Sequence, residues 1–206
     1  EVIETSSNVG TIEVAQDLGA ERLHSYLRRF GYGRQLGVGF PGEASGLLMP
    51  VEQWWNTSLP TIAIGQGVAV TLLQAAHAYA TIANDGVATQ PRVLRGTVGE
   101  DGTLTPASAA EEQRVISETT ARQVRDLLAR VVSGERGTGK QAQVAGYDVA
   151  GKTGTARKPN QGARGYSGKY VASFVGFAPV EEPRIVVAVM VDEPYPIWGG
   201  VVAAPL

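Results

Sequence analysis

The chain has no cysteine in its 206 residues, which excludes disulfide bonds, thiolate metal ligands and a cysteine nucleophile. Its two histidines are too few for a histidine-based metal site. The formal net charge is only −2, so no overall basic field attracts nucleic acid. The longest apolar run, residues 185–191, falls far short of the roughly 20 residues that span a membrane. We therefore expect no metal site and no nucleic-acid partner.

The composition is that of a folded globular protein. Hydrophobic residues make up 43% of the chain and charged residues 18%, which suits one large domain or two very small ones. Apolar residues recur at helical spacing in several segments, and some of these begin at a capping serine or end at a glycine. The expected helices are 9–18, 23–30, 71–84 and 117–133.

Strand-like segments fill the last third of the chain. The expected strands are 92–98, 147–155, 170–178 and 185–191. The turn at 179–183 is short, so the last two strands should form an antiparallel hairpin. The unbroken apolar run of the last strand predicts burial on both faces. We therefore expect an α/β three-layer (α+β) fold, with helices on both faces of an antiparallel sheet.

One motif points to nucleotide binding, but its surroundings do not fit. Residues 146–153 match the phosphate-binding pattern G-x-x-x-x-G-K-T. That pattern needs a helix beginning at its lysine, because the helix N-terminal amides face the phosphates. Pro159 and three glycines follow Lys152, which disfavours a helix there. A P-loop ATPase is therefore an alternative that the sequence disfavours.

A different chemistry follows if Lys152, Thr153, Gly154 and Thr155 lie at an exposed sheet edge. The lysine supplies positive charge and the two threonines donate hydrogen bonds, a combination that can hold a carboxylate. The glycine allows a substrate backbone to approach closely. Residues 151–180 contain five basic residues and no acid, which favours an anionic ligand. A solvated basic hairpin would have the same composition, so that alternative stays open.

Ser6 and Asn8 precede the first expected helix and also admit two interpretations. Serine and asparagine are preferred helix N-caps. The same side chains could instead project into a cleft, the hydroxyl as a proton carrier and the amide as a group that binds a peptide. Taken alone, this segment favours capping.

The two motifs together resemble a known family. S-x-N at 6–8 and K-T-G at 152–154 are two of the three signatures of the serine penicillin-recognising enzymes. Further segments are similar to class B penicillin-binding proteins, in particular the septum-building, division-type enzymes of actinobacteria. These segments are 41–50, 64–74, 79–86, 149–156 and 198–205.

The resemblance implies the penicillin-binding/β-lactamase-like transpeptidase fold and a serine-type D-Ala-D-Ala transpeptidase without a cofactor. Such an enzyme cross-links peptidoglycan stem peptides through an acyl-enzyme and is acylated by β-lactams. It implies membrane-anchored work at the septum, on the extracytoplasmic face of the bacterial membrane, with cell-division membrane proteins as partners. Its anchor would lie upstream of this chain.

The resemblance also assigns roles to residues. Ser6 would relay a proton to the leaving amine, Asn8 would bind a substrate amide, and Lys152 would supply positive potential and orient Ser6. The hydroxyls of Thr153 and Thr155 would hold the terminal carboxylate, and Gly154 would be a substrate-binding residue between them. The backbone N–H of Thr155 would be one of two oxyanion donors.

The chain departs from the family pattern at the nucleophile. No serine has a lysine three positions later, and the family's S-x-x-K motif lies upstream of S-x-N. We therefore expect residues 1–206 to be the C-terminal part of the domain, lacking the nucleophile segment and the final helix. Alone it should be inactive and should need the upstream half of the domain. A carboxypeptidase, a β-lactamase, a β-lactam sensor of the same fold or an inert binding module remain alternatives.

Overall fold

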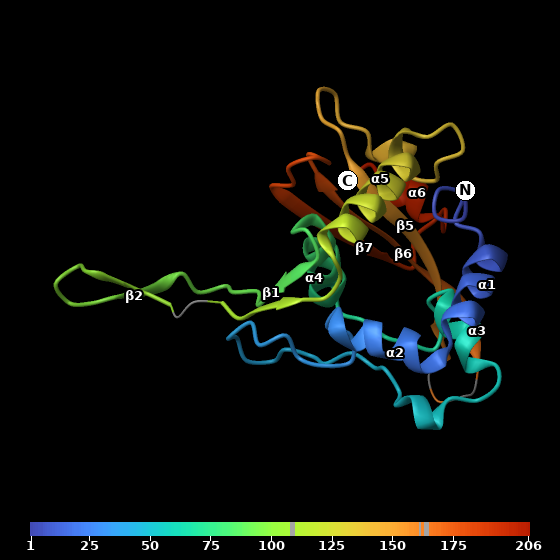
Figure 1. Cartoon of the computed structure of the whole chain (residues 1–206), viewed down its shortest axis with the longest axis horizontal. Coiled ribbons are helices and arrows are strands. Elements are labelled where there is room, and N and C mark those ends of the chain that lie inside the picture. Colours follow the sequence, from blue (N-terminus) through green and yellow to red (C-terminus); the bar gives the residue numbers. More distant parts are fainter. Residues whose placement is uncertain (108–109, 161, 163–164) are drawn as a thin grey trace.

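The computed structural model describes residues 1–107, 110–160, 162 and 165–206. Helices come first, an irregular segment with short helices follows, and a sheet fills the last third (Figure 1). The helices are α1 (Asn8–Leu18), α2 (Ala20–Arg29), α3 (Ser58–Ala63), α4 (Leu72–Ala83), α5 (Glu118–Ser133), α6 (Gly199–Val202) and the 3-10 turns η1 (Val51–Gln53) and η2 (Lys140–Ala142). The strands are β1 (Val87–Thr89), β2 (Gly96–Val98), β3 (Leu104–Pro106), β4 (Glu112–Arg114), β5 (Ala150–Pro159), β6 (Tyr166–Ala178) and β7 (Ile185–Asp192).

The main sheet contains β5, β6 and β7 in that order, and both neighbouring pairs are antiparallel. This confirms the predicted hairpin between the last two strands. Lys152 of β5 lies opposite Val175 of β6, and Phe177 of β6 lies opposite Val186 of β7. Because β6 is the middle strand, β5 is an edge of the sheet as described, which leaves its outer side open.

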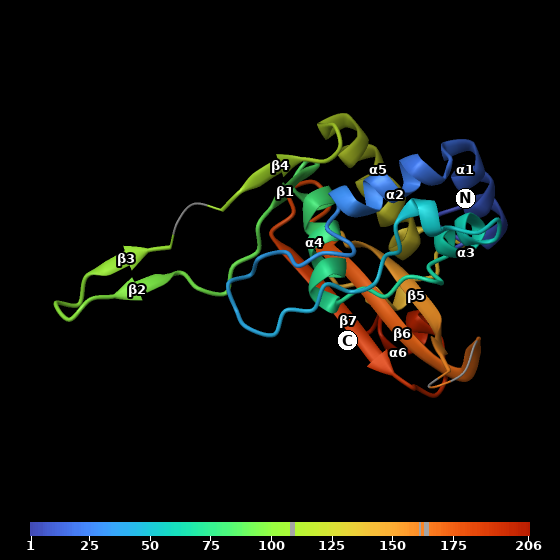
Figure 2. The same ribbon diagram turned by 90° about the horizontal axis from the view of Figure 1, so that it is seen from below.

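Helices pack on both faces of this sheet (Figures 1 and 2). Phe174 and Phe177 lie three residues apart on β6, so their side chains point to opposite faces. Phe174 packs with Ala203 and Ala204 at the end of α6, whereas Phe177 packs against Tyr79 of α4. Helix α5 contributes a buried residue to each cluster. The predicted three-layer arrangement is therefore confirmed.

The helices begin and end where local chemistry places their termini. Ser7 caps α1 and Ser117 caps α5, each with its side-chain oxygen accepting a backbone N–H of the first turn. Thr71 and Gln74 form a reciprocal capping box at the start of α4. Gly19, with φ of +83°, separates α1 from α2. In the described part of the chain, no helix combines the length and apolar character needed to cross a bilayer.

Three strand expectations need correction. Of the segment predicted at 92–98, only Gly96–Val98 forms a strand, and residues 147–149 precede β5 rather than belonging to it. The expectation that 185–191 is buried on both faces is wrong, because Ile185, Val187 and Met190 are 61%, 46% and 55% exposed. No residue of β7 is fully buried, although its apolar run is unbroken.

The segment between β1 and β4 projects far from the body of the molecule (Figures 1 and 2). At its base β1 and β4 pair antiparallel, with Val87 opposite Arg114. Further out β2 and β3 form a second antiparallel pair, with Val98 opposite Leu104. A tight turn at residues 99–103 joins β2 to β3.

Candidate active site

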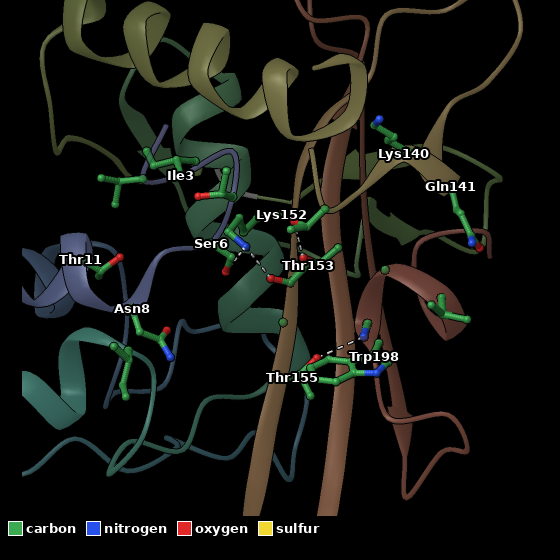
Figure 3. A pocket seen from close by; sticks show the side chains of 18 of the residues that line it. Ile3, Ser6, Asn8, Thr11, Lys140, Gln141, Lys152, Thr153, Thr155 and Trp198 are labelled. Atoms are coloured by element: carbon green, nitrogen blue, oxygen red, sulfur yellow. Dashed lines mark hydrogen bonds between the residues drawn. The ribbon is translucent and has the colours of Figure 1, made fainter. Parts of the chain in front are cut away.

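A cleft of about 790 Å³ separates the N-terminal segment and α1 from β5 and the start of α6. Its lining comes from segments far apart in the sequence, including the end of α3 and the loop before η2. Figure 3 shows Ser6 and Asn8 on one wall and Lys152, Thr153 and Thr155 on the other. All the predicted site residues line this cleft: Ser6, Asn8, Lys152, Thr153, Gly154 and Thr155.

Ser6 is directed into the cleft by its backbone. Its φ is +55°, a left-handed conformation that costs a non-glycine residue roughly 1–3 kcal/mol. The cap of α1 is the next residue, Ser7, whose Oγ accepts the Gly10 N–H at 3.3 Å. The Ser6 Oγ instead accepts a hydrogen bond from Lys152 Nζ at 2.8 Å (Figure 3). Helix capping and the cleft hydroxyl are therefore functions of two different serines.

Asn8 is the first residue of α1, two positions after Ser6. Its side chain is exposed and lies on the same wall of the cleft (Figure 3). A side-chain amide carries one carbonyl acceptor and one NH₂ donor, which together match the two polar groups of a peptide bond. The S-x-N spacing thus places a hydroxyl and an amide side by side at the start of one helix.

Lys152 reaches across the cleft from β5. Burial lowers the pKa of its ammonium group from 10.5 to about 8, because the charged form loses hydration. Its Nζ also donates to the backbone oxygen of Thr153 at 3.0 Å. No ion pair found in the described residues includes this lysine. The cleft therefore contains a cation that has no carboxylate to neutralise it, which favours an anionic ligand.

The two threonine hydroxyls of β5 are each held by a residue that the sequence motifs do not identify. Thr153 Oγ1 lies 2.9 Å from Thr138 Oγ1, within hydrogen-bond distance. Thr155 Oγ1 accepts the backbone N–H of Gly199 at 3.2 Å. A hydroxyl that accepts from an amide keeps its own proton for donation, so Thr155 can donate into the cleft. Thr138 has no sequence signal, whereas the Gly-Gly pair at 199–200 hints at a close approach.

The missing side chain of Gly154 does allow a close approach, but the group that approaches it is the backbone of Gly199 in the same chain. A Cβ at Gly199 would lie 2.3 Å from the Gly154 oxygen and 2.5 Å from the Ser173 oxygen. A Cβ at Gly154 itself would lie 2.4 Å from Ser173 Oγ. The start of α6 therefore rests directly on the backbone of β5. The sequence predicts that Gly154 leaves room for a substrate backbone. In the structure, its lack of a side chain also allows α6 to pack against β5.

The structure also contradicts the nucleotide-binding alternative. Residues Ala150–Pro159 form one strand, so no helix begins at Lys152. A P-loop lysine lies at a helix N-terminus, where backbone amides face the phosphates. Here the lysine side chain points from a strand toward a serine hydroxyl (Figure 3).

Comparison with known proteins agrees with this geometry. The whole chain, residues 1–206, matches the family model of the penicillin binding protein transpeptidase domain. The chain is 47% identical over 195 residues to penicillin-binding protein PbpB of Mycolicibacterium smegmatis, a match covering 92% of this chain and 30% of that protein. It is 39% identical over 206 residues to the probable peptidoglycan D,D-transpeptidase PenA of Neisseria gonorrhoeae, a match covering 99% and 33%.

A solved structure gives the same result in three dimensions. Penicillin binding protein 3 from Mycobacterium tuberculosis, complexed with aztreonam, matches with a TM-score of 0.89 at 44% identity. The match covers 94% of this chain and 44% of that one. The chain thus spans about a third of the length of the curated relatives it matches. With the family model matched from end to end and the fold reproduced, the chain belongs to the penicillin-binding protein transpeptidase domain family.

Proposed function

We propose that this chain forms part of the active site of a peptidoglycan D,D-transpeptidase, which cross-links stem peptides during septal wall synthesis. The observation that carries the proposal is the 2.8 Å hydrogen bond from Lys152 Nζ to Ser6 Oγ, which joins residues 146 positions apart. It brings the S-x-N and K-T-G motifs together across one cleft. The family match over residues 1–206 supports the same activity.

In the proposed reaction, a serine of the same protein outside residues 1–206 attacks the carbonyl carbon of the penultimate D-Ala. The bond to the terminal D-Ala breaks, and the proton that the attacking serine loses passes through Ser6 to the leaving nitrogen. The amine of a neighbouring stem peptide then attacks the resulting ester. That amine loses a proton as the serine oxygen regains one, and a new amide bond forms. Two acyl transfers of this kind divide one difficult step into two easier ones.

The terminal carboxylate of the donor peptide is proposed to bind the hydroxyls of Thr153 and Thr155. Lys152 supplies positive charge beside them, and the bound carboxylate would in turn favour its charged form. Thr138 would hold the Thr153 hydroxyl, as its 2.9 Å contact suggests. Asn8 would hold an amide of the donor side chain. The arrangement separates the group that recognises the substrate's charge from the group that carries the proton.

The developing oxyanion needs N–H donors that are not already hydrogen bonded within the sheet. As described, β5 pairs only with β6, and every second amide of an edge strand points away from its neighbour. We propose the backbone N–H of Thr155 as one oxyanion donor. A preorganised donor of this kind contributes about 3–4 kcal/mol to transition-state stabilisation.

The cellular setting is part of the proposal. We propose that the nucleophile and a membrane anchor lie upstream of this chain, and that the protein works at the extracytoplasmic face with cell-division membrane proteins. The resemblance to division-type enzymes supports this setting. β-Lactams are proposed ligands of the same cleft, because the Mycobacterium tuberculosis relative has a structure complexed with aztreonam.

The test is acylation of the complete protein of which these residues form part. We would incubate it with a fluorescent penicillin and locate the labelled residue by mass spectrometry. Label is expected on a serine outside residues 1–206. Ser6→Ala should slow acylation at least about 100-fold, the usual contribution of a proton-transfer group. Ser7→Ala is the matched control, because it should cost the helix cap about 1 kcal/mol and leave acylation of the folded protein intact.

Each other outcome has its own meaning. Absence of label on the wild-type protein would contradict an acyl-enzyme and favour an inert binding module. Release of D-Ala without a cross-linked product, when donor peptide and amine acceptor are both supplied, would indicate a carboxypeptidase. Equal loss of acylation in Ser6→Ala and Ser7→Ala would remove the proposed role of Ser6.

A further inference from the structure

The hairpin formed by β2 and β3 projects from the body of the molecule (Figures 1 and 2), and we call it the arm. We define the arm as residues 96–106, in which β2 and β3 pair antiparallel through a tight turn. Figures 1 and 2 show it extending away from the helices and the main sheet. Val98 and Leu104, which lie opposite each other, are 69% and 43% exposed. An isolated two-stranded hairpin is marginally stable in water, so a further strand would stabilise the arm.

The hydrogen bonds of the arm show which way each backbone group points. The Gly99 N–H donates to the Thr103 oxygen at 2.9 Å, and the Ala107 N–H donates to the Arg95 oxygen at 2.9 Å. In an antiparallel pair, the residues that turn their N–H and C=O toward the neighbouring strand alternate with those that turn them away. The odd-numbered residues of β2 therefore face β3.

The even-numbered residues of β2 present an open edge. The N–H and C=O groups of Gly96 and Val98 point away from β3, and β2 contains no proline. The other strand of the arm is a poorer edge, because Pro106 of β3 has no N–H to donate. An exposed strand edge of this kind is a template for pairing with another strand. The geometry thus favours β2 as the edge that is extended.

The charges at the two ends of β2 indicate what pairs with it. Exposed Arg95 precedes the strand, and exposed Glu100 and Asp101 follow it. A second β2 strand running parallel would place like charges beside one another. Running antiparallel, it places the arginine of each copy beside the acidic turn of the other, twice. Opposite charges on neighbouring strands stabilise the pairing, and like charges weaken it.

We propose that β2 pairs antiparallel with β2 of a second copy of this chain, about a two-fold axis at Thr97. In this register Gly96 faces Val98 of the second copy, so the outward N–H and C=O groups of both residues are paired. Antiparallel pairing about a two-fold axis is self-complementary, which closes the assembly as a dimer. The two arms then form one four-stranded sheet. The inference does not depend on the proposed activity.

The expected dimer is weak. Its interface is confined to the two arms, and interfaces well below about 1,200 Å² belong to transient complexes. The flanking charges are exposed, so salt should weaken the association further. Dimerisation should therefore depend on protein concentration and on ionic strength, and be favoured where the protein is locally concentrated.

The absence of cysteine allows a direct test of the register. In the proposed dimer the two Thr97 residues are opposite each other and not hydrogen bonded, with Cα atoms about 4.5 Å apart, which suits a disulfide. Thr97→Cys should form a cross-linked dimer under mild oxidation. Thr105→Cys is the matched control, because this residue lies opposite Thr97 on β3 and is also exposed, but outside the proposed edge.

Three further variants test the backbone pairing and the charges that are proposed to hold the dimer together. Val98→Pro removes one outward N–H and should abolish concentration-dependent dimerisation in sedimentation equilibrium, with unchanged circular dichroism. Arg95→Glu should weaken the dimer at low salt, and adding Glu100→Arg and Asp101→Arg should restore it. A wild-type chain that stays monomeric at millimolar concentration overturns the proposal. Equal cross-linking of the Thr97 and Thr105 variants would overturn the register and with it the proposed edge.

Discussion

Lys152 and Lys158 lie six residues apart on the same strand, yet the protein treats them in opposite ways. Lys158 donates to both oxygens of Asp192, at 2.8 and 3.0 Å, and to Glu193 at 2.8 Å. Those hydrogen bonds, with Asp192 first, raise its pKa above the usual value. Lys152 is half-buried without a carboxylate, and its pKa is lowered to about 8. One lysine has a fixed charge, and the other can gain or lose its proton near neutrality.

The difference between the two lysines distinguishes a structural ion pair from a candidate functional group. Carboxylates satisfy Lys158 and join the ends of β5 and β7, which is a task for a permanently charged residue. Burial removes hydration from the Lys152 ammonium group, and no carboxylate compensates for that loss. Groups with a pKa perturbed in this way concentrate at functional sites. Substituting each lysine in turn tests whether the two side chains have these different roles.

The largest effect is expected from Lys152→Met. The substitution removes the charge and the donor to Ser6 while keeping the aliphatic stem, so penicillin acylation of the complete protein should fall roughly 100- to 10,000-fold. Lys158→Met should keep the acylation rate of the wild type. Stopped-flow fluorescence of acylation measures both. Comparable losses in the two variants would mean that β5 needs positive charge in general rather than at one atom.

A smaller effect is expected from pH. Lys152 is charged below about pH 8 and becomes neutral above it, because its pKa is lowered. The charged form attracts the donor carboxylate, so affinity for a D-Ala-terminated peptide should be full below pH 8 and fall up to about tenfold per unit above it. Isothermal titration from pH 6 to 10 checks this, with Lys152→Met expected to give a flat profile. A decline starting only near pH 10.5 would contradict the lowered pKa.

The smallest effect is expected from Lys158→Met in stability. The ion pairs with Asp192 and Glu193 lie at the surface with their carboxylates 58% and 39% exposed, and such pairs contribute little. Tm should fall slightly at low ionic strength, and the difference from wild type should shrink in 1 M salt as screening removes the attraction. A large decrease that persists at high salt would show that Lys158 contributes by packing of its stem, not by its charge.

Much of the fold follows from local patterns in the sequence. Apolar spacing places α1, α4 and α5, and Ser117 and Gly19 act as expected at helix termini. The strand containing K-T-G is predictable because its glycines and proline rule out a helix. The extent of β2 and the exposure of β7 are not, because both depend on which strands and helices the folded chain brings against them. Pairing partners are a property of the tertiary structure, so local spacing does not reveal them.

The candidate site also has residues that the sequence predicts and contacts that only the folded chain shows. The K-T-G segment by itself indicates Lys152 as part of an anion site, whereas Ser6 and Asn8 become site residues only through the resemblance. The direct contact of Ser6 with Lys152 requires the folded chain, because it joins opposite ends of the sequence. The lowered pKa depends on burial, which a motif cannot express. Thr138 could not be predicted for a similar reason. It is an isolated threonine in a polar loop, and only its contact with Thr153 in the folded chain places it at the site.

The contact between Gly154 and Gly199 fixes a dimension of the cleft. Both residues line it, and their main chains meet where neither has a side chain. The spacing of β5 and α6 is therefore set by the radii of backbone atoms, which side-chain substitutions elsewhere on either element cannot alter. β5 and α6 both belong to the wall that faces Ser6 and Asn8, so this contact fixes the shape of that wall (Figure 3). A change in the width of the cleft must then come from the opposite wall, which the N-terminal segment and α1 form.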